Sequence, residues 1–177
     1  MWICPTLVVN DVPRSDPGGL EQASFVPPDV FVRYQRMYPN RGSDPRTTAP
    51  ARAVFLGILG ALHAGGAHLL LGTDTMKIGT LPGYSLHTEL QNFVAARLTP
   101  YEAIRAGTAD AARFLHQENE FGVVRTGLRA DLLLVNANPL LDVKNVSEIA
   151  GVMANGRWST LADLNRQLVG LRATYRH

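Results

Sequence analysis

A short apolar run that ends in a single acid constrains the fold of this chain most. Leu69-Leu70-Leu71 reads as a buried strand, and Gly72-Thr73-Asp74 follows it directly. A helix-like segment, 49–64, precedes the run and is ended by Gly65-Gly66. With the apolar segment Trp2–Val9 as an earlier strand, the order predicts a parallel βαβ unit. Asp74 would then stand at the carboxyl end of a buried strand, where α/β proteins place their chemistry.

Composition and charge narrow the class of protein. The 177 residues are 46% hydrophobic, which suits one domain with a sizeable core. A net charge of +2 without a basic run gives no indication of nucleic-acid binding. Residues 53–73 carry no Asp, Glu, Lys or Arg, but His63, His68 and the glycine pair interrupt them. We therefore expect a helix–turn–strand unit, with no membrane span, in a soluble protein for which the cytoplasm is favoured.

The single cysteine, Cys4, excludes an intrachain disulfide. It lies in an apolar run, so a buried and unreactive thiol is expected. Residues 10–47 then form a long excursion, either a pocket wall or a solvated loop, with one helix over about 28–37. Further helices are expected over 86–97, whose apolar residues share one face, and from Thr99-Pro100 to about residue 106.

The carboxyl-terminal third changes from helical to strand-like patterns. Thr108 is expected to cap one more helical segment, and short strands follow. Asn155-Gly156 predicts a two-residue hairpin turn. The spacing of Thr160 and Asp163 predicts a capping box at the start of a last helix, which either packs back onto the body or pairs with a second chain. The expected strands are 121–124, 130–135 and 149–154, with 157–158 on the return.

Six segments, taken in order, carry a resemblance to one enzyme family. Two are strand-like, Trp2–Val9 and Leu71–Asp74, and a loop with a helix follows at Pro82–Leu90. The others are Leu98–Thr108 with Ala111–Leu115, Gly127–Val135 with Asn138-Pro139-Leu140, and Val152–Trp158. Together they resemble the metal-dependent amidohydrolases, and most closely the imidazolonepropionase-like and prolidase-like branch.

The resemblance implies an α/β fold that contains part of a TIM-like (β/α) barrel. Residues 1–120 would hold its last two strands and helices, 121–159 a small β-sandwich portion, and 160–177 a C-terminal helix. A complete barrel takes ~250 residues. The family's His-x-His, bridging lysine and two later histidines have no counterpart here among five histidines. The chain therefore resembles the carboxyl-terminal part of an amidohydrolase.

The resemblance also assigns roles to individual residues. It makes Asp74 a metal ligand and the proton shuttle, with a divalent metal, zinc by expectation, as the cofactor. His87 and Tyr84 are candidates for binding a small amide or dipeptide-like substrate, and Lys77 lies in the same loop. From the residues alone, the favoured interpretation of His87 is a solvated or capping histidine, and that of Glu89 is a surface residue of its helix.

Two non-enzymatic interpretations stay open. The chain is either an inactive piece that docks to a complementary barrel segment or self-associates, or a small α/β binding module. Two barrel strands alone leave open sheet edges, which favour association.

Overall fold

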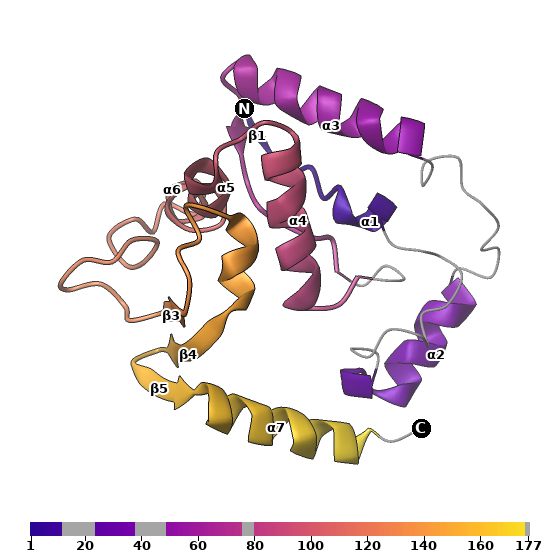
Figure 1. Cartoon of the computed structure of the whole chain (residues 1–177), viewed down its shortest axis with the longest axis vertical. Coiled ribbons are helices and arrows are strands. Elements are labelled where there is room, and N and C mark those ends of the chain that lie inside the picture. Colours follow the sequence, from indigo (N-terminus) through magenta and orange to yellow (C-terminus); the bar gives the residue numbers. More distant parts are fainter. Residues whose placement is uncertain (12–23, 38–48, 76–79, 176–177) are drawn as a thin grey trace.

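The computed structural model describes residues 1–11, 24–37, 49–75 and 80–175, and these form a mixed α/β structure. Helix α4 stands in the middle of the molecule, with α3 across one end and a three-stranded sheet toward the other (Figure 1). The helices are α1 (Val8–Asp11), α2 (Pro28–Met37), α3 (Ala49–Ala64), α4 (Tyr84–Ala95), α5 (Pro100–Ala106), α6 (Ala109–Phe114), α7 (Leu161–Thr174) and the 3₁₀ helix η4 (Val143–Ser147); the strands are β1 (Trp2–Ile3), β2 (His68–Leu69), β3 (Leu132–Val135), β4 (Ile149–Ala154) and β5 (Arg157–Thr160).

Strands β1 and β2 pair in parallel, which confirms the predicted βαβ unit with α3 in the crossover. Trp2 lies opposite His68, and their rings stack with centroids 4.7 Å apart. Strand β2 ends at Leu69, so it covers only the first residue of the Leu69-Leu70-Leu71 run that predicts a strand. The N–H of Leu71 donates instead to the carbonyl of Ala106 in α5. The carboxyl ends of both strands therefore face the same side, toward α4 and α5.

The prediction of one strand over Trp2–Val9 is wrong beyond Ile3. Pro5 has no N–H to give to a sheet, and Thr6 takes a left-handed backbone with φ 50°. The chain then turns into α1. The N–H groups of Leu7 and Val8 donate to the carboxylate of Glu89 on α4, at 2.8 and 2.7 Å. A buried acid far along the chain has thus replaced a strand partner.

Helix α4 carries the centre of the hydrophobic core. Leu90 and Phe93 are buried on its apolar face, as the helical spacing predicts, and they pack with Leu59 of α3 and Ala103 of α5. Helix α4 also contacts α1 and η4. One central helix therefore joins the parallel strand pair, the helical layer and the carboxyl-terminal part.

Helix α5 begins at the N-cap that Thr99-Pro100 predicted, and the structure shows a full capping box there. The hydroxyl of Thr99 accepts from the N–H of Glu102, and the Glu102 carboxylate accepts from the N–H of Thr99 at 2.8 Å. The backbone N–H of Thr99, and then its hydroxyl, which donates to the same carboxylate oxygen at 2.7 Å, lower the pKa of Glu102. Because the carboxylate is preferred in the folded state, its contribution is present above its ordinary pKa and is lost as the pH falls through the lowered value.

We expect Thr99→Ala to lower the free energy of unfolding by about 1 kcal/mol, the usual cost of losing an N-cap. The substitution should also move the pKa of Glu102 back toward its ordinary value. Urea denaturation and an NMR titration of the Glu102 carboxyl measure the two effects. Thr160→Ala removes the matching capping box of α7 and serves as the comparison. An unchanged Glu102 pKa in Thr99→Ala would contradict this account.

Helix α6 follows Thr108, as predicted, but Thr108 does not cap it with its side chain. The Thr108 hydroxyl donates to the carbonyl of Ile104 in the preceding helix at 2.8 Å. The α5–α6 junction is held instead by Asp110, which is buried. Its carboxylate accepts from Arg105 and Arg113, each at 2.8 Å.

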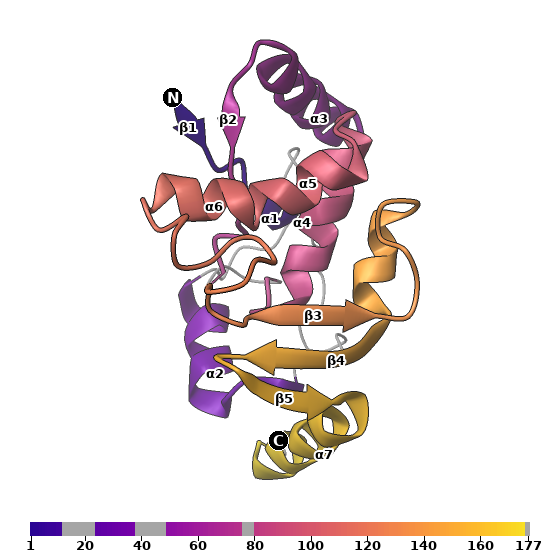
Figure 2. The same cartoon turned by 90° about the vertical axis from the view of Figure 1, so that its left-hand side faces the viewer.

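Strands β3, β4 and β5 form an antiparallel sheet in chain order (Figure 2). Asn155 and Gly156 have φ of 51° and 77°, the positive pair that a two-residue hairpin turn requires, so this prediction is confirmed. The predicted strand 121–124 is wrong. Gly122 instead turns with φ 105° against Ala112, and the Arg129 guanidinium lies 4.8 Å from the centre of the Phe121 ring.

Helix α7 packs back onto the body, contacting β4 and β5. Near its end, Arg172 donates to the hydroxyl of Ser24 at 3.0 Å and lies over the Phe25 ring. The expected β-sandwich portion is thus one sheet covered by a helix within the part of the chain that the structure describes. None of the helices described there is long and apolar enough to cross a membrane.

Candidate functional site

Asp74 lies five residues beyond the end of β2, on the side toward which both parallel strands end. Its side chain is exposed, and its backbone is left-handed with φ 47°. Aspartate tolerates this region better than most residues do, and such backbone positions gather at functional sites. On either side of it, the hydroxyls of Thr73 and Thr75 lie 3.1 Å apart. The predicted acid is therefore presented to solvent by a sharp bend.

Cys4 directly follows strand β1 and lies beside the segment that carries Asp74. A Cβ on Gly72 would come 2.5 Å from its sulfur, so only glycine leaves room for this approach. Cys4 is exposed, which corrects the expectation of a buried thiol. Partial desolvation of the sulfur and then the nearby charges of Glu89 and Asp74 raise the pKa of the Cys4 thiol. The cysteine and both acids therefore share one neighbourhood.

Glu89 is fully buried, which the interpretation as a helix-surface residue missed. Besides the two backbone amides of the segment after β1, Asn92 faces its carboxylate at 3.4 Å. Arg52 of α3 in turn donates to the Asn92 side chain at 2.7 Å. The signal was present in the spacing, since Glu89 stands three residues after Leu86 and four before Phe93, on the apolar face.

His87 points to the carboxyl-terminal part of the chain. Its Nδ1 lies 3.0 Å from the hydroxyl of Ser147 in η4. Its side chain is half-buried, and this burial lowers the pKa of His87. The contact gives His87 a structural role between α4 and η4, alongside the predicted role in substrate binding.

We expect the neutral form of His87 to make stability depend on pH. Because its pKa is lower in the folded state, the unfolded chain binds more protons, and the free energy of unfolding falls as the pH drops below the ordinary histidine pKa. Urea denaturation midpoints at pH 7.5 and 5.5 should show this loss, and His87→Asn should reduce it. His116→Asn, at an exposed histidine, is the control substitution. An identical pH dependence in His87→Asn would show that another group is responsible.

Tyr84 opens α4, and its ring is stacked on Phe25 with centroids 6.2 Å apart. Tyr84 remains 40% exposed, so a ligand can reach part of it. The Phe25 ring also contacts the guanidinium of Arg172 in α7, which lies 4.8 Å from the ring centre. Lys77 lies outside the described residues, as does most of the excursion over 10–47.

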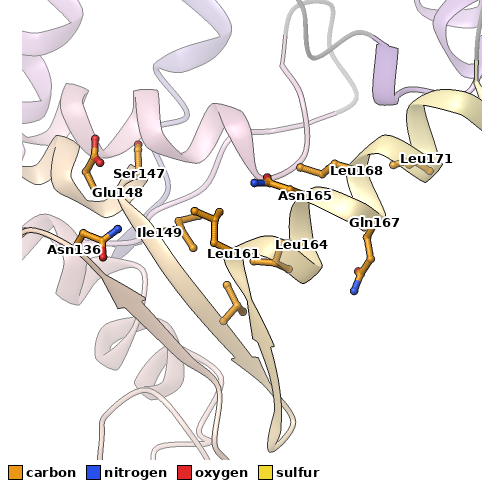
Figure 3. Close-up of a pocket in the computed structure, with 11 residues that line it drawn as sticks. Asn136, Ser147, Glu148, Ile149, Leu161, Leu164, Asn165, Gln167, Leu168 and Leu171 are labelled. Atoms are coloured by element: carbon orange, nitrogen blue, oxygen red, sulfur yellow. The ribbon is translucent and has the colours of Figure 1, made fainter.

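The described residues do not by themselves fit a metal centre. Within the parts of the chain that the structure describes, no three His, Cys, Asp or Glu side chains come together as a possible metal site. A groove of about 730 Å³ lies elsewhere, between β4 and α7 (Figure 3). Asp74 is not among its lining residues, although Ser147, the partner of His87, is. Leucines of α7 line much of it: Leu161, Leu164, Leu168 and Leu171.

Comparisons with known proteins identify a region of similarity that includes Asp74. Residues 49–159 match the family described as "Amidohydrolase family". The imidazolonepropionase of Rubrobacter xylanophilus is 40% identical over 97 residues, which is 50% of this chain and 22% of that protein. The chain thus spans about a fifth of the length of the curated relatives that it matches.

Solved structures agree over nearly the whole chain. A putative prolidase from Bifidobacterium longum is 27% identical with a TM-score of 0.63, covering 97% of this chain and 39% of that one. A bottromycin amidohydrolase has a TM-score of 0.73 at 24% identity, covering 98% of this chain and 40% of that one, and so is alike in fold. The arrangement of helices and sheets described above therefore recurs inside larger proteins.

Proposed function

The chain belongs to the amidohydrolase family, and from this premise we propose that it carries one part of the active site of a carbon–nitrogen hydrolase. The substrate class is a small amide, cyclic amide or dipeptide-like molecule. In this proposal β1 and β2 are the last two strands of the family's (β/α) barrel, and the chain is its carboxyl-terminal part. The observation that carries the proposal is the exposed Asp74 at the side where two parallel strands end.

The proposed role of Asp74 is to carry a proton. Its carboxylate would accept a proton from the attacking water and return it to the leaving nitrogen. Amide cleavage needs the second transfer because an amine leaves poorly as an anion. The exposure of the side chain supports this role, since both water and substrate can reach the acid.

Members of the amidohydrolase family generally depend on a metal ion. A catalytic zinc needs about three protein ligands, whereas the described residues bring no such group together. We therefore propose that Asp74 supplies one ligand to a divalent metal, zinc by preference, and that the other ligands come from polypeptide outside the described residues. The relatives' much greater length supports this division.

Tyr84 and His87 are the proposed substrate contacts from this chain. Both lie in the first turn of α4, which follows the loop after Asp74. Tyr84 is partly exposed, and its ring and hydroxyl suit the apolar and polar parts of an amide substrate.

The test is an assay of hydrolysis products, separated by chromatography, with added Zn²⁺. The sample contains the chain together with the polypeptide that supplies the remaining metal ligands. The substrates are an N-acyl amino acid, an Xaa-Pro dipeptide and a cyclic amide, with an ester and a phosphate monoester for comparison. We expect cleavage confined to carbon–nitrogen bonds and abolished by a chelator. Cleavage that survives exhaustive chelation, or that is confined to the ester or phosphate, would overturn the proposed function.

A further inference from the structure

We propose that Glu89 is a positioning residue for the site at Asp74. Its buried carboxylate fixes the loop Cys4–Leu7, and this loop forms a wall beside Asp74. The inference rests on the proposed function only in taking Asp74 as the reacting acid. It assigns a task to a buried acid that neither the hydrophobic core nor the proton transfer uses.

The first observation is that both carboxylate oxygens of Glu89 accept hydrogen bonds from the backbone. Its Oε1 accepts from the N–H of Leu7 at 2.8 Å, and its Oε2 from the N–H of Val8 at 2.7 Å. Two bonds from one rigid carboxylate to consecutive amides fix both the position and the direction of the backbone there. Burying a charge is costly unless such partners compensate it, so simple packing would be better served by an apolar side chain.

The second observation is that neighbouring side chains hold the Glu89 carboxylate in place. Asn92, one turn further along α4, points its side-chain nitrogen at Oε2. The Asn92 oxygen accepts from the Arg52 guanidinium of α3. The carboxylate therefore has one orientation, set by two helices, and transmits that orientation to the loop.

The third observation is at the other end of the loop. The Cys4 sulfur sits over the backbone of Gly72, two residues before Asp74, with no room for a Cβ between them. Between the two anchors, Thr6 keeps a left-handed backbone, which a threonine adopts only when its surroundings hold it there. The loop is thus fixed by Glu89 at one end and rests on the Asp74 segment at the other.

A double-mutant cycle tests whether Glu89, which binds one end of the loop, is coupled to Gly72, which the other end contacts. Gly72→Ala should lower the urea midpoint, because the new methyl group meets a Cys4 sulfur that cannot move. In a Glu89→Gln background the loop is released, so the same substitution should cost less. Distant independent sites are additive, so additivity of Gly72→Ala and Glu89→Gln would overturn the proposal. Glu118→Gln, at an exposed acid, is the matched control and should be additive with Gly72→Ala.

The thiol of Cys4, the single cysteine of the chain, gives a second readout. Removing the Glu89 charge by itself favours the Cys4 thiolate, so the decisive variant is Glu89→Asp, which keeps the charge but is one methylene shorter. Its rate of reaction with Ellman's reagent at one fixed pH should rise several-fold, while Glu118→Gln should leave the rate unchanged. If Glu89→Gln does not fold, Glu89→Asp takes its place in the cycle with the same expected sign. An unchanged thiol rate in folded Glu89→Asp would overturn the proposal.

Neither measurement depends on catalysis. If no amide hydrolysis is found but Gly72→Ala and Glu89→Gln are coupled, the proposed function is refuted and the role of Glu89 in the loop is supported. If amide hydrolysis is found but the two substitutions are additive, the role of Glu89 is refuted and the proposed function is supported.

Discussion

Replacing Asp74 by Asn is expected to reduce amide hydrolysis by about 10²–10⁴-fold, the range for losing a general acid–base group. The amide of Asn has nearly the shape of the carboxylate but cannot accept the proton. It also tolerates the left-handed backbone that Asp74 adopts at φ 47°. The folded structure should therefore persist, and the loss should appear in kcat. Initial rates in the zinc assay measure it, with circular dichroism and a thermal melt as the check on folding.

The matched control is Asp29→Asn, at an exposed acid on α2. It removes the same charge from the protein and should leave the rate unchanged. If Asp74→Asn keeps the full rate, Asp74 is not the proton carrier. If the rate falls only through a higher KM, its role is substrate binding.

The second large effect is on stability. Phe93→Ala should lower the free energy of unfolding by about 3–5 kcal/mol, the usual cost of emptying a buried aromatic site. Phe93 is 0% exposed and packs where α3, α4 and α5 meet. Because whole domains are stable by only about 5–15 kcal/mol, this one substitution threatens folding at elevated temperature. Urea denaturation of both proteins at one temperature gives the difference.

Phe114→Ala is the control of the same chemistry at a surface position. Phe114 is 45% exposed and meets Trp2 edge-on, with centroids 5.7 Å apart. Its loss should cost about 0.5–1.5 kcal/mol, the value of one aromatic pair. Equal losses in the two variants would contradict the placement of the core around α4.

Local signals in the sequence predicted most of the helices. The ranges 28–37 and 49–64 agree with α2 and α3, and the N-cap at Thr99 and the capping box at Thr160 start α5 and α7 as expected. These features depend on residues within one or two turns, so a single sequence contains them. The Asn155-Gly156 hairpin is of the same kind, because two adjacent positive φ angles decide it.

The errors arose where distant residues decide the backbone. No residue near Val8 in the sequence indicates the turn into α1. The N–H of Val8 donates to Glu89, which lies 81 residues away. The apolar stretch 121–124 looks like a strand, but Gly122 packs against α6 and no strand forms. The end of the apolar run and the family resemblance made Asp74 a candidate, whereas the neighbourhood of Cys4, Asp74 and Glu89 became visible only once β1 and β2 were paired.

The hydrogen bond from Leu7 to Glu89 also determines how early this part of the chain can fold during synthesis. The two residues are 82 positions apart, so the amide of Leu7 is made long before its acceptor. At a translation rate of about 5–20 residues per second, the interval is roughly 4–16 s. Strand β1 waits nearly as long for His68 and Leu69. Throughout that interval the apolar segment Trp2–Val9 has neither of these partners, so its apolar side chains stay open to non-native association until the partners are made.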